Sequence, residues 1–181
     1  MNKRRCGSRM LKAACFVFAL AFLGVVCSAI TVEAAIPQKG SVAVLVKGPS
    51  EQHAASTESI ITGQLLMNGY KIVDPKVLNR IRRDKAAVLA LEGNVDAIMK
   101  LGRTYGFSTL VSARVEAGAP VLNEFKLYTG TASAAVMATA SNGSRLYADT
   151  VSGKQVGYTP DEARQKSIEA AAKLAVERMT K

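Results

Sequence analysis

The sequence predicts an α+β fold, in which a mixed and largely antiparallel sheet packs with helices in the order βαβαα-βββ-α. In the first half, short runs of β-branched residues alternate with segments of helical periodicity. In the second half, extended runs follow one another, and an Asn-Gly pair joins two of them as in a hairpin. One helix with a small-residue face closes the chain. These features indicate a single domain over residues 35–181.

A strand and a helix open this domain. Residues 41–46 (SVAVLV) have the composition of a buried strand, which Gly48-Pro49 ends. Residues 50–55 are polar, and we expect them to form a loop. Apolar residues at helical spacing then predict a helix from residue 56 or 57 to residue 67, and Asn68-Gly69 stops it.

A strand and two helices follow. Residues 70–73 (YKIV) predict the strand. Asp74-Pro75 supplies an N-cap and a favourable first position for a helix that runs to Gly93. A second helix is expected over residues 95–105, with Gly106 as its carboxyl-terminal cap.

The second half predicts three strands and a helix. Residues 108–117 alternate apolar and polar side chains, and residues 129–140 are rich in small and hydroxyl side chains. Asn142-Gly143 turns the chain into a returning strand over residues 145–155. The last helix begins at Thr159 with a capping pattern, and its small buried face is predicted at Ile168, Ala171, Ala172, Ala175 and Met179.

The amino terminus has the features of a secretory signal. A basic leader over residues 1–12 precedes an apolar run over residues 13–32. Val32-Glu33-Ala34 fits the small-x-small rule, so we expect cleavage between Ala34 and Ala35, with a cut after Ala29 as the second choice. The chain is therefore expected in the periplasm. The apolar run is also close to the length that crosses a bilayer, which keeps a retained amino-terminal anchor as the alternative.

Removal of this signal changes the chemistry of the chain. All three cysteines leave with it, namely Cys6, Cys15 and Cys27. The mature protein therefore forms no disulfide. Lipidation at Cys27 is not expected, because a bulky Val stands where a lipoprotein signal has a small residue. Five basic residues and one acidic residue also leave, which lowers the formal net charge from +10 to +6. Such a surface favours acidic partners, such as cell-wall polymers, anionic lipids or acidic protein faces, whereas the compartment argues against nucleic acid.

The residues that could support catalysis are few. His53 is the only histidine and is expected as a solvated loop side chain, so the chain lacks the ligands of a usual zinc site. No phosphate-binding glycine motif is present, and we expect no cofactor. The carboxylates are scattered, and Asp149 is the first candidate if a pair is formed only by folding. We therefore predict no catalytic residue and no enzyme activity.

Two segments are candidate binding surfaces. The densest basic cluster comprises Arg80, Arg82, Arg83 and Lys85. Pairing of Arg80 with Asp84 across one helical turn would compensate part of its charge. It is either a solvated helix face or a surface for an acidic partner. The Ser/Thr/Ala-rich strand is a candidate sheet edge for a partner strand, through Thr131, Ser133 and Thr139, or it packs against the last helix.

The residue patterns resemble a group of bacterial envelope proteins. Residues 70–74 (YKIVD) with the helix after them, and residues 101–106 (LGRTYG) leading into residues 108–111 (STLV), are similar to patterns shared by proteins grouped around the curli secretion channel subunit. This group includes penicillin-binding-protein activator lipoproteins, the amino-terminal domain of TolB and part of flagellar assembly protein T. The resemblance covers nearly the whole mature chain and implies a non-enzymatic adaptor. No lipidation motif and no channel-forming insertion accompany it, so no pore is expected and no functional residue transfers.

These observations predict a periplasmic interaction module that assists assembly or regulation of an envelope machine, whether flagellar, secretory or cell-wall. The partner is expected to be an envelope protein or a cell-wall component. A wall-acting hydrolase with carboxylates that the sequence does not reveal is one alternative. A membrane-tethered envelope subunit, held by a retained signal, is another. The sequence leaves the oligomeric state open.

Overall fold

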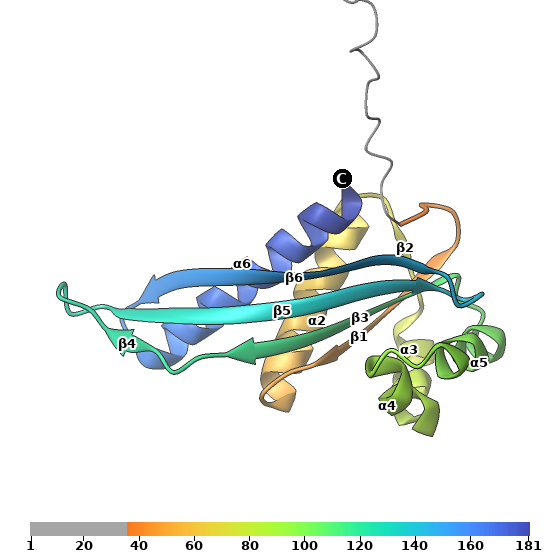
Figure 1. Cartoon of the computed structure of the whole chain (residues 1–181), viewed down its shortest axis with the longest axis horizontal. Helices are drawn as coiled ribbons and strands as arrows, with labels where there is room; N and C mark the ends of the chain where they lie inside the picture. Colours follow the sequence, from red (N-terminus) through yellow and green to blue (C-terminus); the bar gives the residue numbers. More distant parts are fainter. Residues whose placement is uncertain (1–35) are drawn as a thin grey trace, which may run out of the picture. The chain divides into compact units, whose positions relative to one another are not determined.

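Six strands form one mixed sheet in the computed structural model, which describes residues 36–181 (Figure 1). The strands are β1 (Ser41–Lys47), β2 (Lys71–Ile72), β3 (Thr109–Ala117), β4 (Val121–Leu122), β5 (Tyr128–Ala140) and β6 (Arg145–Gly157). The helices are α2 (Glu51–Met67), α3 (Pro75–Arg83), α4 (Lys85–Leu91), α5 (Val95–Tyr105) and α6 (Pro160–Thr180). The predicted signal and its cleavage between Ala34 and Ala35 lie outside the described residues.

The sheet has the strand order β2-β1-β3-β5, with β6 on the far side of β5. Strand β1 is parallel to β2 and to β3, whereas β5 is antiparallel to β3, β4 and β6. The short strand β4 pairs with the start of β5, beyond the end of β3. The predicted α+β class and mixed, largely antiparallel sheet are confirmed. Strand β4 was not predicted, because two residues carry no periodicity.

Helix α2 begins earlier than predicted, so the expected loop over residues 50–55 is wrong. Ser50 is the N-cap, and its hydroxyl oxygen accepts a hydrogen bond from the His53 N–H at 3.3 Å. The first turns of α2 are polar and show no apolar period, but serine is a preferred capping residue. His53 therefore lies in the first turn of a helix.

The single helix predicted after Asp74-Pro75 is divided at Asp84. Asp84 has extended backbone angles, ends α3 and caps α4, because its Oδ1 accepts from the Ala86 N–H at 2.9 Å. An aspartate side chain that bonds to the backbone competes with helix continuation. The break turns α4 into a separate element.

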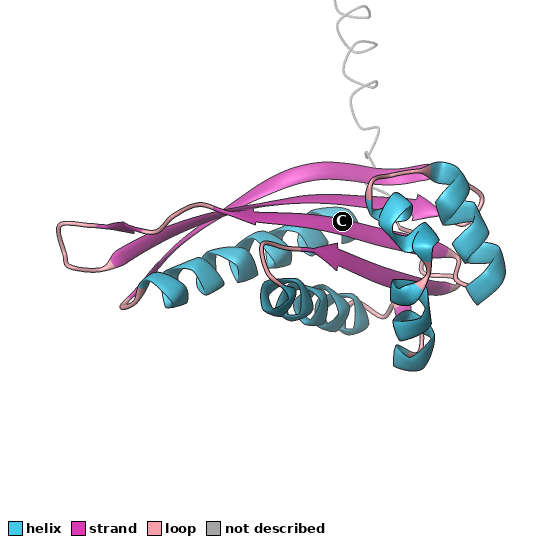
Figure 2. Ribbon diagram, turned by 90° about the horizontal axis from the view of Figure 1, so that it is seen from below, coloured by secondary structure: helices cyan, strands magenta, loops and turns pink. Residues whose placement is uncertain are grey.

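The helices cover the two faces of the sheet unequally (Figure 2). Helices α2 and α6 cover one face, and their apolar residues join the sheet residues in one cluster that includes Val44, Ile61, Val111 and Ile168. Helices α3, α4 and α5 gather at one end of the other face, around Leu45 and other buried residues. The rest of that second face carries no helix among the described residues.

Helix α6 lies close to β5 and β6 because glycines face it. A Cβ atom on Gly153 would lie 2.2 Å from the Ser167 carbonyl oxygen, and one on Gly130 would lie 2.3 Å from the Ala163 carbonyl oxygen. The predicted start of the helix is confirmed, since Thr159 Oγ1 accepts from the Glu162 N–H at 3.2 Å. The predicted small-residue face is buried at every position, namely Ile168, Ala171, Ala172, Ala175 and Met179.

Candidate interaction surface

Strand β5 lies inside the sheet, so the predicted partner edge at Thr131, Ser133 and Thr139 is wrong. Thr131 pairs with Lys154 of β6, and on its other side its carbonyl oxygen accepts from the Gly118 N–H at 2.9 Å. Ser133 and Thr139 have pairing partners on both β3 and β6. The backbone of β5 is therefore not available to a partner strand. Its alternate residues, including Ala132 and Ala134, are buried in the cluster that contains α6.

Strand β6 is the long edge of the sheet, since among the described strands it pairs only with β5. The Thr131 carbonyl points toward Gly118, so odd-numbered residues of β5 direct their backbone groups away from β6. Even-numbered residues such as Ala134, which pairs with Val151, direct theirs toward β6. Odd-numbered residues of β6 therefore point inward. Its even-numbered residues point outward, and we call this row the β6 edge: Ala148, Thr150, Ser152, Lys154 and Val156.

One hydrogen bond agrees with this orientation. The Thr150 N–H donates to Oδ1 of the neighbouring Asp149 at 2.7 Å, which an N–H bonded to β5 would not do. No other outward N–H or C=O of the β6 edge is hydrogen-bonded within residues 36–181. The opposite edge of the sheet, β2, is only two residues long. Strand β1 continues beyond β2, from Ala43 to Lys47, with β3 as its one neighbour among the described strands, but this row is shorter. The β6 edge is thus the longest row of backbone groups without a partner strand in the described sheet.

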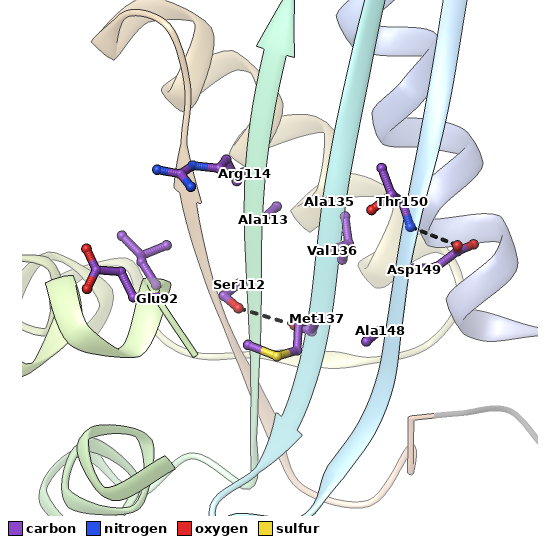
Figure 3. Close-up of a pocket in the computed structure, with 11 residues that line it drawn as sticks. Glu92, Ser112, Ala113, Arg114, Ala135, Val136, Met137, Ala148, Asp149 and Thr150 are labelled. Carbon is purple, nitrogen blue, oxygen red and sulfur yellow. Dashed lines mark hydrogen bonds between the residues drawn. The ribbon is translucent and has the colours of Figure 1, made fainter. Parts of the chain in front are cut away.

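The side chains of the β6 edge lie on the face of the sheet that α6 does not cover. All five are exposed, and their neighbours on this face are Thr131, Ser133 and Ala135 of β5 and Arg114 and Glu116 of β3. We call this surface the open face. A hollow of about 410 Å³ lies on it where it meets the end of α4 at Leu91 and Glu92 (Figure 3). Most side chains of the open face are small, so a bound segment can approach the sheet closely.

Asp149 is a structural carboxylate. It lies on the α6 side of β6, where its Oδ2 accepts from Arg178 Nη1 at 3.0 Å and from the Tyr147 hydroxyl at 3.1 Å. The Arg178 hydrogen bond and then the Thr150 N–H hold the pKa of Asp149 below its usual value. A general acid at neutral pH needs a raised pKa. This geometry gives no support to Asp149 as the acid of a hydrolase.

The basic cluster spans the break between two helices. Arg80, Arg82 and Arg83 belong to α3, and Lys85 is the first residue of α4. Arg82 forms an ion pair with Glu58 of α2, so its charge is compensated from another element. Asp84 accepts from the Tyr105 hydroxyl at 3.2 Å and caps α4, and the predicted ion pair between Asp84 and Arg80 is not formed. Arg80, Arg83 and Lys85 remain candidates for an acidic partner.

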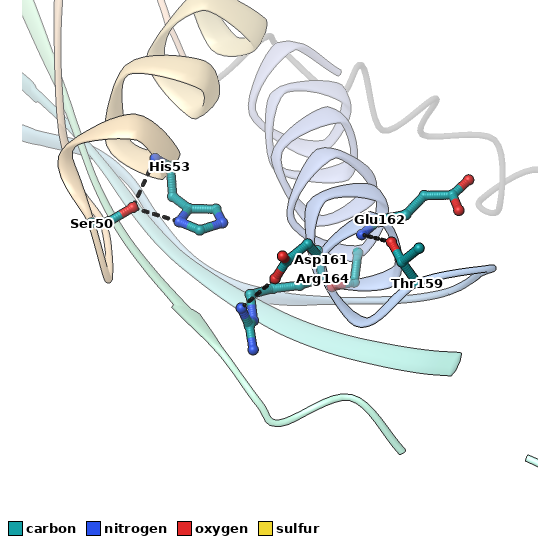
Figure 4. Close-up of polar contacts among 7 residues, drawn as sticks. Ser50, His53, Thr159, Asp161, Glu162 and Arg164 are labelled. Carbon is teal, nitrogen blue, oxygen red and sulfur yellow. Dashed lines mark hydrogen bonds and ion pairs between the residues drawn. The ribbon is translucent and has the colours of Figure 1, made fainter. Parts of the chain in front are cut away.

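His53 lies in the first turn of α2, close to the first turn of α6 (Figure 4). Its Nδ1 is 2.6 Å from Ser50 Oγ, and Asp161 of α6 forms an ion pair with Arg164 at 3.1 Å nearby. Ser50 is occupied as the cap of α2. The hydroxyl that His53 contacts therefore serves to start α2, and the neighbouring Gln165 and Ser56 join α6 to α2 by a hydrogen bond of 2.8 Å.

Two further properties describe residues 36–181. No three His, Cys, Asp or Glu side chains there lie close enough together to hold a metal ion. None of the described helices combines the length and the apolar character needed to span a membrane.

The fold and the β6 edge define a sheet-and-helix module with one open face and one long edge strand. A scan against protein-family models finds no match, and a search of curated proteins also finds none. The chain is similar to several solved structures at low identity, including the following three. Lipoprotein GNA1162 from Neisseria meningitidis is 18% identical, with a TM-score of 0.47, and the match covers 66% of this chain and 85% of that one.

The PelC dodecamer from Paraburkholderia phytofirmans is 14% identical, with a TM-score of 0.47 and coverage of 83% and 96% of the two chains. The LpoB C-terminal domain from Salmonella enterica is 11% identical, with a TM-score of 0.39 and coverage of 72% and 87%. At these values the likeness carries no conclusion about activity or partner. No family is shown, and the predicted link with flagellar assembly protein T is not confirmed.

Proposed function

We propose that the chain is a non-enzymatic interaction module of the bacterial envelope, and that it binds a partner by strand addition at the β6 edge. The envelope location rests on the export signal predicted over residues 1–34. The resemblance of the short apolar patterns to envelope adaptors supports the same class. Assembly or regulation of a flagellar, secretory or cell-wall machine is the role in which such a module would act.

The single observation that carries this proposal is the unpaired row of the β6 edge. Proteins usually protect a long edge strand, because its N–H and C=O groups are a template for another chain. On β6 the protection is partial: Asp149 occupies one N–H, and an irregularity at Ala138/Thr139 interrupts the ladder only near the hairpin. An extended partner segment would satisfy the remaining groups.

The test is affinity purification of the protein from its own envelope, with a variant that alters only the β6 edge. Ser152→Pro removes an outward N–H and places a ring where a partner strand would lie, while the inward bonds to β5 remain. We expect this variant to lose the co-purifying partner. Ser133→Lys is the matched control, because it changes the open face at β5 and leaves the β6 edge intact.

Circular dichroism of both variants establishes that the sheet is still formed. If folded Ser152→Pro protein recovered the same partners as the unaltered protein, strand addition at β6 would be rejected. A separate variant tests whether the exposed basic residues of α3 and α4 bind a partner. Replacing Arg80, Arg83 and Lys85 together by Glu would reduce partner recovery if an acidic surface docks there, and would leave recovery unchanged if they only solvate the helices.

A further inference from the structure

The row of α6 residues beneath β6 forms a half-buried shelf. Ala170 lies under Gly153, because a Cβ atom placed on Gly153 would be 3.2 Å from the Cβ of Ala170. Arg178, about two turns further along α6, donates a hydrogen bond to Asp149. Leu174 lies between them on the same helical row, because residues four apart share a face. Ala170 and Leu174 are both only partly buried. We call Ala170 and Leu174 the α6 shelf.

A strand added to β6 would place alternate side chains on opposite faces of the sheet. One set would lie on the α6 side, next to Val151 and Gly153 and above the α6 shelf. Val151 and Gly153 are buried, so this side favours apolar residues. The other set would lie on the open face, next to Thr150, Ser152 and Lys154, where side chains are polar and exposed.

The charges beside the β6 edge are unevenly compensated. Glu116, in the open-face hollow that Ser152 and Lys154 also line, forms no ion pair with a described residue, but Asp149 and Glu177 are engaged with Arg178 and Lys181. In contrast, Arg145 and Lys154 of β6 and Lys173 of α6 form no ion pair with any residue in the described part of the chain. Lys154 is the one charged side chain in the outward row of β6, so the charge that a partner strand meets directly is positive.

This excess of cations distinguishes two occupants of the β6 edge. A second copy of the chain, paired through its own β6, would bring a second set of Arg145, Lys154 and Lys173 to the same interface. Like charges across paired strands are destabilising. A segment with acidic side chains would instead compensate these cations.

We propose that the segment that pairs with the β6 edge is an extended, acidic stretch of a partner protein in which every second side chain is apolar. Its acidic side chains lie on the open face near Lys154, and its apolar side chains lie on the α6 shelf. This inference rests on the proposed function, because it specifies the partner of the same edge.

The test is selection of random decapeptides on the immobilised protein, with Ser152→Pro protein used to discard peptides that bind elsewhere. We expect the retained peptides to alternate apolar and polar positions and to be rich in Asp and Glu. Synthetic copies should bind at least tenfold more weakly to Ser152→Pro protein, and their affinity should fall as salt is raised. The variant Lys154→Glu should weaken them several-fold, whereas Lys47→Glu, at the end of the interior strand β1, should not.

Three outcomes would overturn the inference. The first is the absence of any peptide that depends on the β6 edge. The second is retained peptides that are basic, uncharged or without alternation. The third is a dimer of the unaltered protein, measured by light scattering, that becomes a monomer in Ser152→Pro, because the occupant would then be a second copy. Each outcome is separate from the purification of envelope partners, which can still show that a partner depends on the β6 edge.

Discussion

Arg178 of α6 donates a hydrogen bond to Asp149 of β6 at 3.0 Å and so ties the last helix to the edge strand. The Asp149 carboxylate also occupies the N–H of Thr150, one of the outward groups of β6. The same side chain thus stabilises the helix layer and covers part of the β6 edge.

Replacing Asp149 should lower stability in a pH-dependent manner. Its pKa is lowered in the folded protein, first by the Arg178 hydrogen bond, so its contribution is complete above the ordinary carboxyl pKa of about 3.9. That contribution is lost as pH falls through the lowered value. We expect Asp149→Asn to lower the urea midpoint at pH 7 and to lower it by less near pH 2. Glu124→Gln, in an exposed loop, is the control, and an equal effect of Asp149→Asn at both pH values would contradict the prediction.

The close contact of β6 with α6 requires glycine at residue 153. A Cβ there would lie 2.2 Å from the Ser167 carbonyl oxygen and 2.6 Å from the Ala171 nitrogen, so α6 would have to move. We expect Gly153→Ala to destabilise the protein by about 1–3 kcal/mol in urea unfolding, as overpacking does. Gly63→Ala in α2 is the matched control, because no atom lies within 4 Å of its Cβ position. It should stabilise by up to about 1 kcal/mol, and similar results for both variants would refute the packing argument.

The ion pair between Glu58 and Arg82 joins α2 to α3. Burial raises the pKa of Glu58, and Arg82 partly opposes this. The Glu58 side chain is only 12% exposed, so Arg82→Ala would leave a buried carboxylate without its cation. We expect a loss of about 1–3 kcal/mol at pH 7, measured by chemical unfolding.

The loss should shrink as pH falls. A carboxyl whose folded pKa is raised takes up its proton in the folded state first, which favours folding at lower pH. Arg83→Ala, on the same helix and exposed, should change stability by no more than about 0.5 kcal/mol. A loss that stays constant from pH 7 to pH 4 would indicate that packing, and not the charge of Glu58, is responsible.

Export is tested by the intact mass of the protein recovered from cells. Cleavage between Ala34 and Ala35 should give a chain that begins at Ala35 and contains no cysteine, so thiol reagents should not modify it. A full-length mass in the membrane fraction would instead support the tethered alternative.

Local signals in the sequence were sufficient for most elements. The Asn142-Gly143 turn, the Thr159 cap and the Gly106 stop depend on backbone preferences of single residues, and the structure places each as predicted. The division of the helix at Asp84 was missed, because an aspartate inside an apolar period can either face solvent or cap a new helix. The packing of α4 beside β1 and β3 decides whether Asp84 stays within one helix or caps a second one.

The candidate site depended on information that the sequence does not contain. Thr131 and Ser133 were correctly seen as small polar positions of a strand, but their placement at an edge was wrong because β3 and β6 pair with β5 on both sides. Strand order follows from contacts between distant segments.

The sequence by itself determined the α+β class, the basic charge and the small-residue face of α6, since these follow from composition and local periodicity. The tertiary structure alone decided that β6 is the edge strand, that Asp149 is bound by Arg178, and that cations remain uncompensated beside the unpaired backbone groups. These relationships depend on strand order and on which side chains meet across elements, and hydrogen bonding and burial fix them only when the whole chain packs.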